Sequence, residues 1–252
     1  MAPGAQRRRV LLTAAAGLAL AGGGVGLWHL SQGPPLPSIA NPEPVPPSAP
    51  RLTLLSPPGM HKPLEGLNLR ESAMTGHWHW LDDKPGGTLA ISYTHEQPSL
   101  KILHLPVNPG TLGYDLKCEV FFEHRGGHLA FLLPAGQARP SLVLDLYDYS
   151  GIEFIRDADW KTNGTTVARM LPSGRFLPLT LQVRPQGGQV AITVQLDGKP
   201  FITWEGLQSD LSLPEENYPS AVVNHRGPVL TLQSLYGAAA VRSLEVTILP
   251  EP

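Results

Sequence analysis

The side chains best suited to chemistry gather between residues 145 and 163. Asp145 and Asp148 are three residues apart, so a regular strand would point them to opposite faces, whereas Asp157 and Asp159 would share a face. Hydrolysis of a glycosidic bond needs two carboxyl groups, about 5 Å apart for retention and further apart for inversion. A strand that supplies them as Glu-x-Asp-x-x-Glu is excluded, because no Glu-x-Asp occurs in the chain. We therefore interpret these four acids as turn and surface residues.

Four histidines raise the question of a metal site. His77 and His79 would share one strand face, and His124 and His128 bracket a short Arg-Gly-Gly turn. A structural zinc ion needs four protein ligands, and no group of His, Asp and Glu with metal-ligand spacing completes either pair. The pattern favours structural or surface roles for these histidines, and no metal-ligating residue is assigned.

Neither a cofactor nor a catalytic nucleophile is expected. Cys118 lies in the apolar pattern of residues 114–122, which predicts a buried, inert thiol. The chain has no Gly-x-Ser-x-Gly elbow and no Gly-x-x-x-x-Gly-Lys phosphate loop. Calcium is the one cofactor left open, although Lys161 stands in the loop where the ion would need an oxygen ligand. We assign no catalytic residue and favour a function without catalysis.

Residues 147–163 form the best candidate for a ligand-binding segment. Sugar recognition combines flat apolar faces with polar groups for the hydroxyls. The segment offers both kinds of group, and its predicted ligand-binding residues are Tyr147, Tyr149, Asp157, Asp159, Trp160 and Asn163. The alternative is that Tyr147 belongs to the core and Trp160 covers a sheet edge.

A run of short strands must position these residues. In residues 189–204, Val190, Ile192, Val194 and Leu196 alternate with other residues, and an Asp-Gly pair then allows a tight turn into a second strand. Similar strands are expected at residues 76–81, 88–93, 100–105, 114–123, 128–133, 141–147, 152–156, 165–170, 176–183, 221–224, 229–236 and 241–249. Residues 64–74 would make a short helix or an irregular turn. In the last strand, the alternation would place Arg242 on one face with Leu244, Val246 and Ile248, opposite to Val241. So many strands without an amphipathic helix predict an all-β, antiparallel sandwich or barrel.

The first 59 residues differ from the rest. Three arginines at residues 7–9 precede an apolar stretch at residues 10–30, which predicts either a membrane anchor or a twin-arginine export signal that is cleaved. We favour the anchor, which would leave the domain on the extracytoplasmic side of an inner membrane. The domains expected are 1–30 (signal or anchor), 31–59 (a proline-rich linker) and 60–252 (the β domain).

Composition limits the partners. The chain carries a formal net charge of −2, with 26 Gly and 27 Pro among 252 residues. Nothing in it forms a basic surface for phosphates, so nucleic acid is not an expected partner. The abundant Gly and Pro favour turns over long helices.

The order of several short motifs resembles that of a known group of folds. These motifs are Gly76-His77-Trp78, Gly87-Thr88-Leu89, Tyr114-Asp115-Leu116, Gly151-Ile152-Glu153, Asn163-Gly164-Thr165 and Leu196-Asp197-Gly198. Over residues 64–249 the chain resembles concanavalin A-like, laminin-G-like jelly-roll modules of planctomycete-type bacterial proteins that are secreted or tethered to a membrane. It is also distantly similar to the 3-keto-disaccharide hydrolase domains, but has Leu64-Glu65-Gly66-Leu67 in place of their Phe-Asp-Gly opening. The resemblance implies a two-sheet jelly-roll sandwich.

Three functions are compatible with these features. The first, which we favour, is a non-catalytic module in the cell envelope that binds a glycan or another surface component. The second is a glycosidase-like or keto-sugar hydrolase in the same fold, and the third is a protein-interaction domain. The oligomeric state is left open.

Overall fold

A computed structural model describes residues 54–91, 100–124, 127–153, 155–156, 163–211, 229–235 and 237–251. The predicted anchor, nearly all of the predicted linker and the strand expected at residues 221–224 lie outside these residues. Within them, no helix combines the length and the apolar character needed to cross a membrane.

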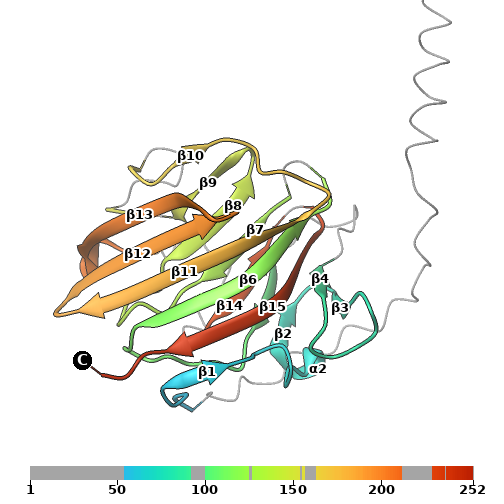
Figure 1. The fold of residues 1–252 in the computed structure, drawn as a ribbon, viewed down its shortest axis with the longest axis horizontal. Coiled ribbons are helices and arrows are strands. Elements are labelled where there is room, and N and C mark those ends of the chain that lie inside the picture. The colour runs from blue at the N-terminus through green and yellow to red at the C-terminus, as the bar shows by residue number, and fades with distance from the viewer. Residues whose placement is uncertain are drawn as a thin grey trace, which may run out of the picture. The chain divides into compact units, whose positions relative to one another are not determined.

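The described strands form two antiparallel sheets, here called sheet 1 and sheet 2, that pack face to face as a sandwich. In Figure 1, sheet 1 lies in front of sheet 2. Sheet 1 has the order β13 (Lys199–Leu207), β12 (Gln189–Leu196), β11 (Phe176–Gln186), β6 (Tyr114–Phe122), β15 (Ala239–Ile248), β4 (Leu89–Ile91) and β3 (Trp78–Trp80), and β1 (Gly59–His61) also pairs with β15. Sheet 2 has the order β10 (Val167–Ala168), β9 (Tyr149–Glu153), β8 (Ser141–Leu146), β7 (Leu129–Leu132), β14 (Thr231–Ser234), β5 (Lys101–His104) and β2 (Ala73–Thr75). The all-β sandwich predicted from the sequence is confirmed.

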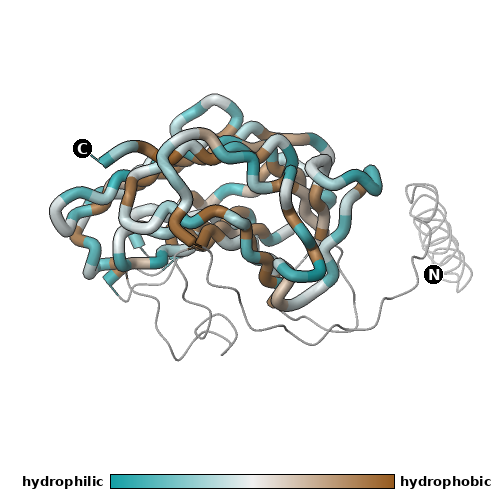
Figure 2. The backbone as a smooth tube through the Cα atoms, turned by 90° about the horizontal axis from the view of Figure 1, so that it is seen from below, coloured by the Kyte–Doolittle hydropathy of each residue, from teal (hydrophilic) through white to brown (hydrophobic). Residues whose placement is uncertain are grey.

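The core fills the space between the two sheets. On β6, Tyr114, Leu116, Cys118, Val120 and Phe122 are all buried, while the residues between them are more exposed. This alternation places every second side chain against the other sheet, and apolar residues recur along the strands of both sheets (Figure 2).

The hairpin of β12 and β13 forms as predicted. Val190, Ile192, Val194 and Leu196 are buried in the core. Asp197 and Gly198 both have positive φ, 55° and 70°, as a two-residue turn of type I′ requires. The returning strand continues beyond Trp204 to Leu207.

Several element boundaries differ from those predicted. Residues 64–74 contain the four-residue helix α2 (Leu69–Ser72) and then β2, and a short 3₁₀ helix, η1 (Gln208–Asp210), follows β13. β9 begins at Tyr149 rather than at residue 152, and only Val167–Ala168 of residues 165–170 is a strand. β1 begins at Gly59, the last residue of the predicted linker.

The phase of β15 corrects one sequence-based assignment. The alternation predicted that Arg242 shares a face with Leu244, opposite to Val241. Instead Val241 is 1% exposed, and the Arg242 Nε donates to Glu119 Oε2 (2.8 Å) on the outer face of sheet 1. A bulge between Arg242 and Glu245, with Ser243 at a φ of 53°, shifts the phase.

Candidate functional site

Tyr147 lies in a tight turn that displays its side chain. Leu146 and Tyr149 pair across the end of the β8–β9 hairpin, and the two residues between them, Tyr147 and Asp148, have φ values of 51° and 69°. Such a turn favours Asn-Gly, and an aromatic residue at positive φ is strained by about 1 kcal/mol. The Tyr147 side chain is 56% exposed. The alternative in which Tyr147 belongs to the core is therefore wrong.

Asp145, predicted to be a turn or surface acid, is completely buried. Its Oδ1 accepts a hydrogen bond from the Leu171 backbone N–H (3.0 Å), and its own N–H donates to Ser150 Oγ (3.0 Å). The positive φ of Asp145, 57°, breaks the alternation of β8 and so allows this geometry. We conclude that the carboxylate fastens the chain near Leu171 to sheet 2.

Asn163, predicted to bind ligand, has a structural role. It is 7% exposed. Its Nδ2 donates to the Ile152 carbonyl (2.6 Å), and its Oδ1 accepts from the N–H and the hydroxyl of Thr165 (3.0 and 2.6 Å). Both ends of the amide are thus used in joining this segment to β9.

Asn163→Asp is expected to destabilise the protein by about 2 kcal/mol, because the new carboxylate places an oxygen opposite the Ile152 carbonyl and leaves that buried acceptor unpaired. Urea denaturation at neutral pH measures this change. Asn68→Asp is the matched control, since the exposed Asn68 Oδ1 caps α2 by accepting from the Arg70 N–H, which a carboxylate does equally well. Equal stability of the two variants would contradict the role assigned to the Asn163 amide.

The other predicted binding residues divide into two groups. Tyr149 lies on β9 and is half-buried. Asp157, Asp159 and Trp160 lie outside the described residues. The predicted cluster as a whole therefore stays a prediction.

The outward face of sheet 2 carries a set of polar residues that the sequence analysis missed. Leu103, Phe131, Leu142, Ile152 and Leu232 point into the core, so their neighbours along each strand point outward. The pairing of the strands aligns two outward rows. One row is His104, Thr231, Leu132, Ser141 and Glu153, and the other is Ile102, Gln233, Ala130, Val143 and Gly151.

Two side chains of these rows are buried without a hydrogen bond. Ser141 is 0% exposed and Gln233 is 2% exposed. In the part of the chain that the structure describes, neither Ser141 Oγ nor Gln233 Nε2 has a partner. Thr231 is on the same strand as Gln233 and in the same row as Ser141, and its Oγ1 lies 2.8 Å from His104 Nδ1. Leaving a buried polar group unpaired costs about 1–3 kcal/mol, which a sheet face serving only as scaffold would avoid.

The residues at the edge of this face, which we call its margin, are more exposed to solvent than the residues at its centre. Glu153 and Tyr149 on β9, and His104 on β5, are all half-buried. Glu153 is directly opposite Ser141 in the pairing of β8 with β9. It is also the one acid in the two rows, so they do not supply the pair of carboxyl groups that glycoside hydrolysis needs.

The histidines do not combine into one site. His128 is buried, and its Nδ1 accepts the Leu235 backbone N–H (2.6 Å), whereas the His124 side chain is 80% exposed. Burial lowers the pKa of His79, and Asp83 opposes this effect. Among the described residues, no group of three or more His, Cys, Asp or Glu could hold a metal ion.

Cys118 is buried, as the sequence predicted. Burial, reinforced by the neighbouring Glu119 carboxylate, strongly raises the pKa of its thiol. Because the thiolate is the reactive form, this cysteine is not a nucleophile.

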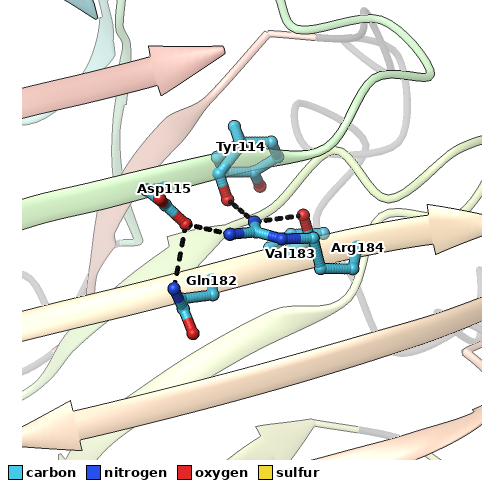
Figure 3. A network of polar contacts seen from close by, with 5 residues as sticks. All are labelled: Tyr114, Asp115, Gln182, Val183 and Arg184. Carbon is cyan, nitrogen blue, oxygen red and sulfur yellow. Dashed lines mark hydrogen bonds and ion pairs between the residues drawn. The ribbon is translucent and has the colours of Figure 1, made fainter. Parts of the chain in front are cut away.

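The outer face of sheet 1 carries a different kind of polar network (Figure 3). The Arg184 guanidinium pairs with Asp115, and its Nη1 donates to the carbonyls of Tyr114 (2.8 Å) and Val183 (3.0 Å). Gln182 Nε2 donates to the same Asp115 carboxylate (3.2 Å). These contacts join β6 to β11. The Arg184 guanidinium and the Asp115 carboxylate both have partners within the network, so we interpret it as structural.

Comparisons with known proteins find only distant structural matches. No family model matches the chain, and a search of curated proteins also finds no match. Solved structures that match include peanut lectin, with 11% identity and a TM-score of 0.47, covering 76% of this chain and 97% of the lectin. A carbohydrate-binding module from Bacillus subtilis matches with 8% identity and a TM-score of 0.43, covering 70% of this chain and 94% of the module. An endo-1,3-β-glucanase from Streptomyces sioyaensis matches with 10% identity and a TM-score of 0.42, covering 65% of this chain and 76% of the glucanase.

The strands define this protein as an all-β, antiparallel two-sheet jelly-roll sandwich, which confirms the predicted fold class. The finer likeness to 3-keto-disaccharide hydrolases stays a prediction. At these identities and TM-scores, similarity to the solved structures carries no argument about activity, so function must be argued from the site.

Proposed function

We propose that this protein is a non-catalytic module that binds a glycan across the outward face of sheet 2. The observation that carries the proposal is the pair of buried, unpartnered polar side chains on that face, Ser141 and Gln233. A ligand rich in hydroxyl groups that enters from the more open edge of the face and displaces what covers these two side chains would supply the missing hydrogen bonds, because each hydroxyl both donates and accepts.

The remaining groups of the face suit the same class of ligand. Glu153 and His104 offer a carboxylate and an imidazole at the margin, and Tyr149 adds an aromatic ring. The two rows contain no Lys or Arg, and their one carboxylate repels anions. These features favour a neutral glycan over a sulfated or uronic acid polymer.

Gln233→Leu separates binding from stability. Removing an unpaired buried amide is expected to stabilise the free protein by about 1 kcal/mol, because an apolar side chain of similar size carries no desolvation cost. The same change is expected to weaken glycan binding at least tenfold. The experiment applies the full-length chain to an array of neutral and anionic glycans, then titrates the strongest ligand by calorimetry and compares melting temperatures.

Gln195→Leu is the matched control, since Gln195 is an exposed glutamine on sheet 1. It is expected to leave affinity unchanged. The proposal fails if the wild-type protein binds no glycan on the array, or if Gln233→Leu binds as the wild type does. Loss of stability in Gln233→Leu would instead show that the amide is part of the scaffold.

A further inference from the structure

The chain has one Asn-Gly sequence, Asn163-Gly164, and this pair of residues can react with itself. Asparagine is among the thermolabile residues of proteins. In an Asn-Gly sequence the backbone nitrogen of the glycine can attack the carbonyl carbon of the asparagine side chain, because glycine has no side chain to shield that nitrogen. The question is whether the fold permits this reaction.

The reaction converts the asparagine into an acid. A bond forms between the Gly164 nitrogen and Asn163 Cγ, and the bond between Cγ and Nδ2 breaks. Nδ2 leaves as ammonia together with the proton of the Gly164 nitrogen. Water then opens the resulting cyclic imide at either of its carbonyl carbons. The products are aspartate and isoaspartate, in which the backbone runs through the side-chain carboxyl carbon.

In the folded protein, hydrogen bonds hold both ends of the Asn163 amide. Nδ2, the leaving group, donates to the Ile152 carbonyl at 2.6 Å. Oδ1 accepts from the Thr165 N–H at 3.0 Å and from the Thr165 hydroxyl at 2.6 Å, and these two bonds fix the amide plane. Loss of ammonia must break the bond to Ile152, so the fold opposes the reaction.

The same two side chains take the place of a neighbouring strand beside Ile152. Thr165 Oγ1 accepts from the Ile152 N–H at 3.0 Å, and Asn163 Nδ2 donates to the Ile152 carbonyl. Both backbone groups of this β9 residue are therefore paired through side chains. Asn163 is 7% exposed and Thr165 is 6% exposed, so the water that opens the imide has little access.

We propose that Asn163 is a self-modification site, which the fold keeps closed and which reacts once the contact with β9 opens. The aspartate product places a carboxylate oxygen opposite the Ile152 carbonyl, and the isoaspartate product also lengthens the backbone. Either product prevents the segment from docking again on β9 as before. The modification therefore marks chains that have unfolded. It does not depend on the proposed glycan binding, because Asn163 is in neither outward row of sheet 2.

The test incubates the full-length protein at mildly alkaline pH with and without urea, at one temperature. Mass spectrometry of proteolytic peptides measures conversion at residue 163, and chromatography separates the two products. We expect conversion to be about a hundredfold slower without urea, because opening must break the hydrogen bonds of the Asn163 amide. After removal of urea, the fraction of chains that regain the original melting temperature should fall as conversion rises.

Gly164→Ala is the matched variant. A Cβ at this position would meet nothing within 4 Å, so the folded protein should keep its melting temperature. In the unfolded chain the methyl group hinders the attack, and conversion should slow by about tenfold. The wild type should therefore lose its capacity to refold with time in urea, whereas Gly164→Ala should retain it.

Thr165→Val tests the closed state itself. It removes the hydroxyl that bonds both Asn163 and Ile152, and conversion without urea should become about tenfold faster. Thr203→Val, which changes an exposed threonine on β13, should convert as the wild type does.

Two results would overturn the proposal. Equal rates of conversion with and without urea would show that the fold does not protect the Asn163 amide. Equal loss of refolding in Gly164→Ala and in the wild type would assign the damage to another residue. Neither result affects glycan binding by the freshly folded wild type, which is measured separately.

Discussion

Lowering the pH from 6.5 to 4 is expected to reduce the free energy of unfolding by about 3 kcal/mol through His128 alone. Burial lowers the pKa of this imidazole from 6.5 to about 3, with a smaller contribution from the positive charge of Lys101. In the unfolded chain His128 titrates near its ordinary value. Between these two values the unfolded state binds the extra proton, so stability falls by about 1.4 kcal/mol per pH unit as the solution is acidified.

The geometry explains why protonation is costly. The Leu235 N–H donates to His128 Nδ1 at 2.6 Å, so this nitrogen must be unprotonated and the ring proton is assigned to Nε2. A second proton on Nδ1 would break the bond and leave a charge in the core. The bond joins the start of β7 to the end of β14, two neighbouring strands of sheet 2.

Urea denaturation at several pH values between 7 and 4 measures this effect. His128→Gln should lower stability at pH 7, because the amide oxygen replaces Nδ1 imperfectly, and should flatten the dependence on pH. His124→Gln, which changes an exposed histidine four residues away, should keep the wild-type slope. An equally steep slope in His128→Gln would assign the acid sensitivity to other groups.

The predictable part of the fold is the part encoded by neighbouring residues. The β12–β13 hairpin follows from an alternating strand and an Asp-Gly turn, both of which are local. The phase of β15 was assigned wrongly because the bulge at Ser243 has no signature in the pattern of residue types. Asp145 was misplaced for a similar reason, since its positive φ ends the alternation that the sequence analysis assumed.

The candidate site was harder to predict because pairing between distant strands creates it. Thr231, Leu132 and Ser141 become neighbours only when β14, β7 and β8 pair in the observed register. The polar residues Thr231 and Gln233 alternate with Leu232 and so signal a strand with one polar face. Nothing in that pattern indicates that the polar face is buried. Tyr147 was a candidate from the sequence, but its exposure follows from the turn after β8, whereas the predicted strand at residues 141–147 left open whether it was core or displayed.

Gly237→Ala is expected to cost about 3 kcal/mol, and Gly174→Ala only about 1 kcal/mol. Both glycines have nearly the same positive φ, 74° and 76°, so both alanines bear the same backbone strain. A Cβ on Gly174 would meet nothing within 4 Å, whereas one on Gly237 would lie 2.7 Å from the Gly127 Cα. Because that atom belongs to the backbone, no side-chain rotation can relieve the clash. Urea denaturation of both variants at neutral pH measures the difference, and equal costs would contradict the assigned contact.

The same contact connects this prediction with the first one. Gly127 directly precedes His128, and Gly237 follows Leu235 by two residues, so the close approach of the two glycines brings the His128–Leu235 hydrogen bond within reach. In Gly237→Ala the two segments must separate, and water should reach the imidazole. The pKa of His128 should then rise towards 6.5, and the loss of stability on acidification should become shallower. An NMR titration of the histidine ring protons checks this directly, with Gly174→Ala expected to leave His128 unchanged. An unshifted His128 in Gly237→Ala would show that its burial does not depend on this backbone contact.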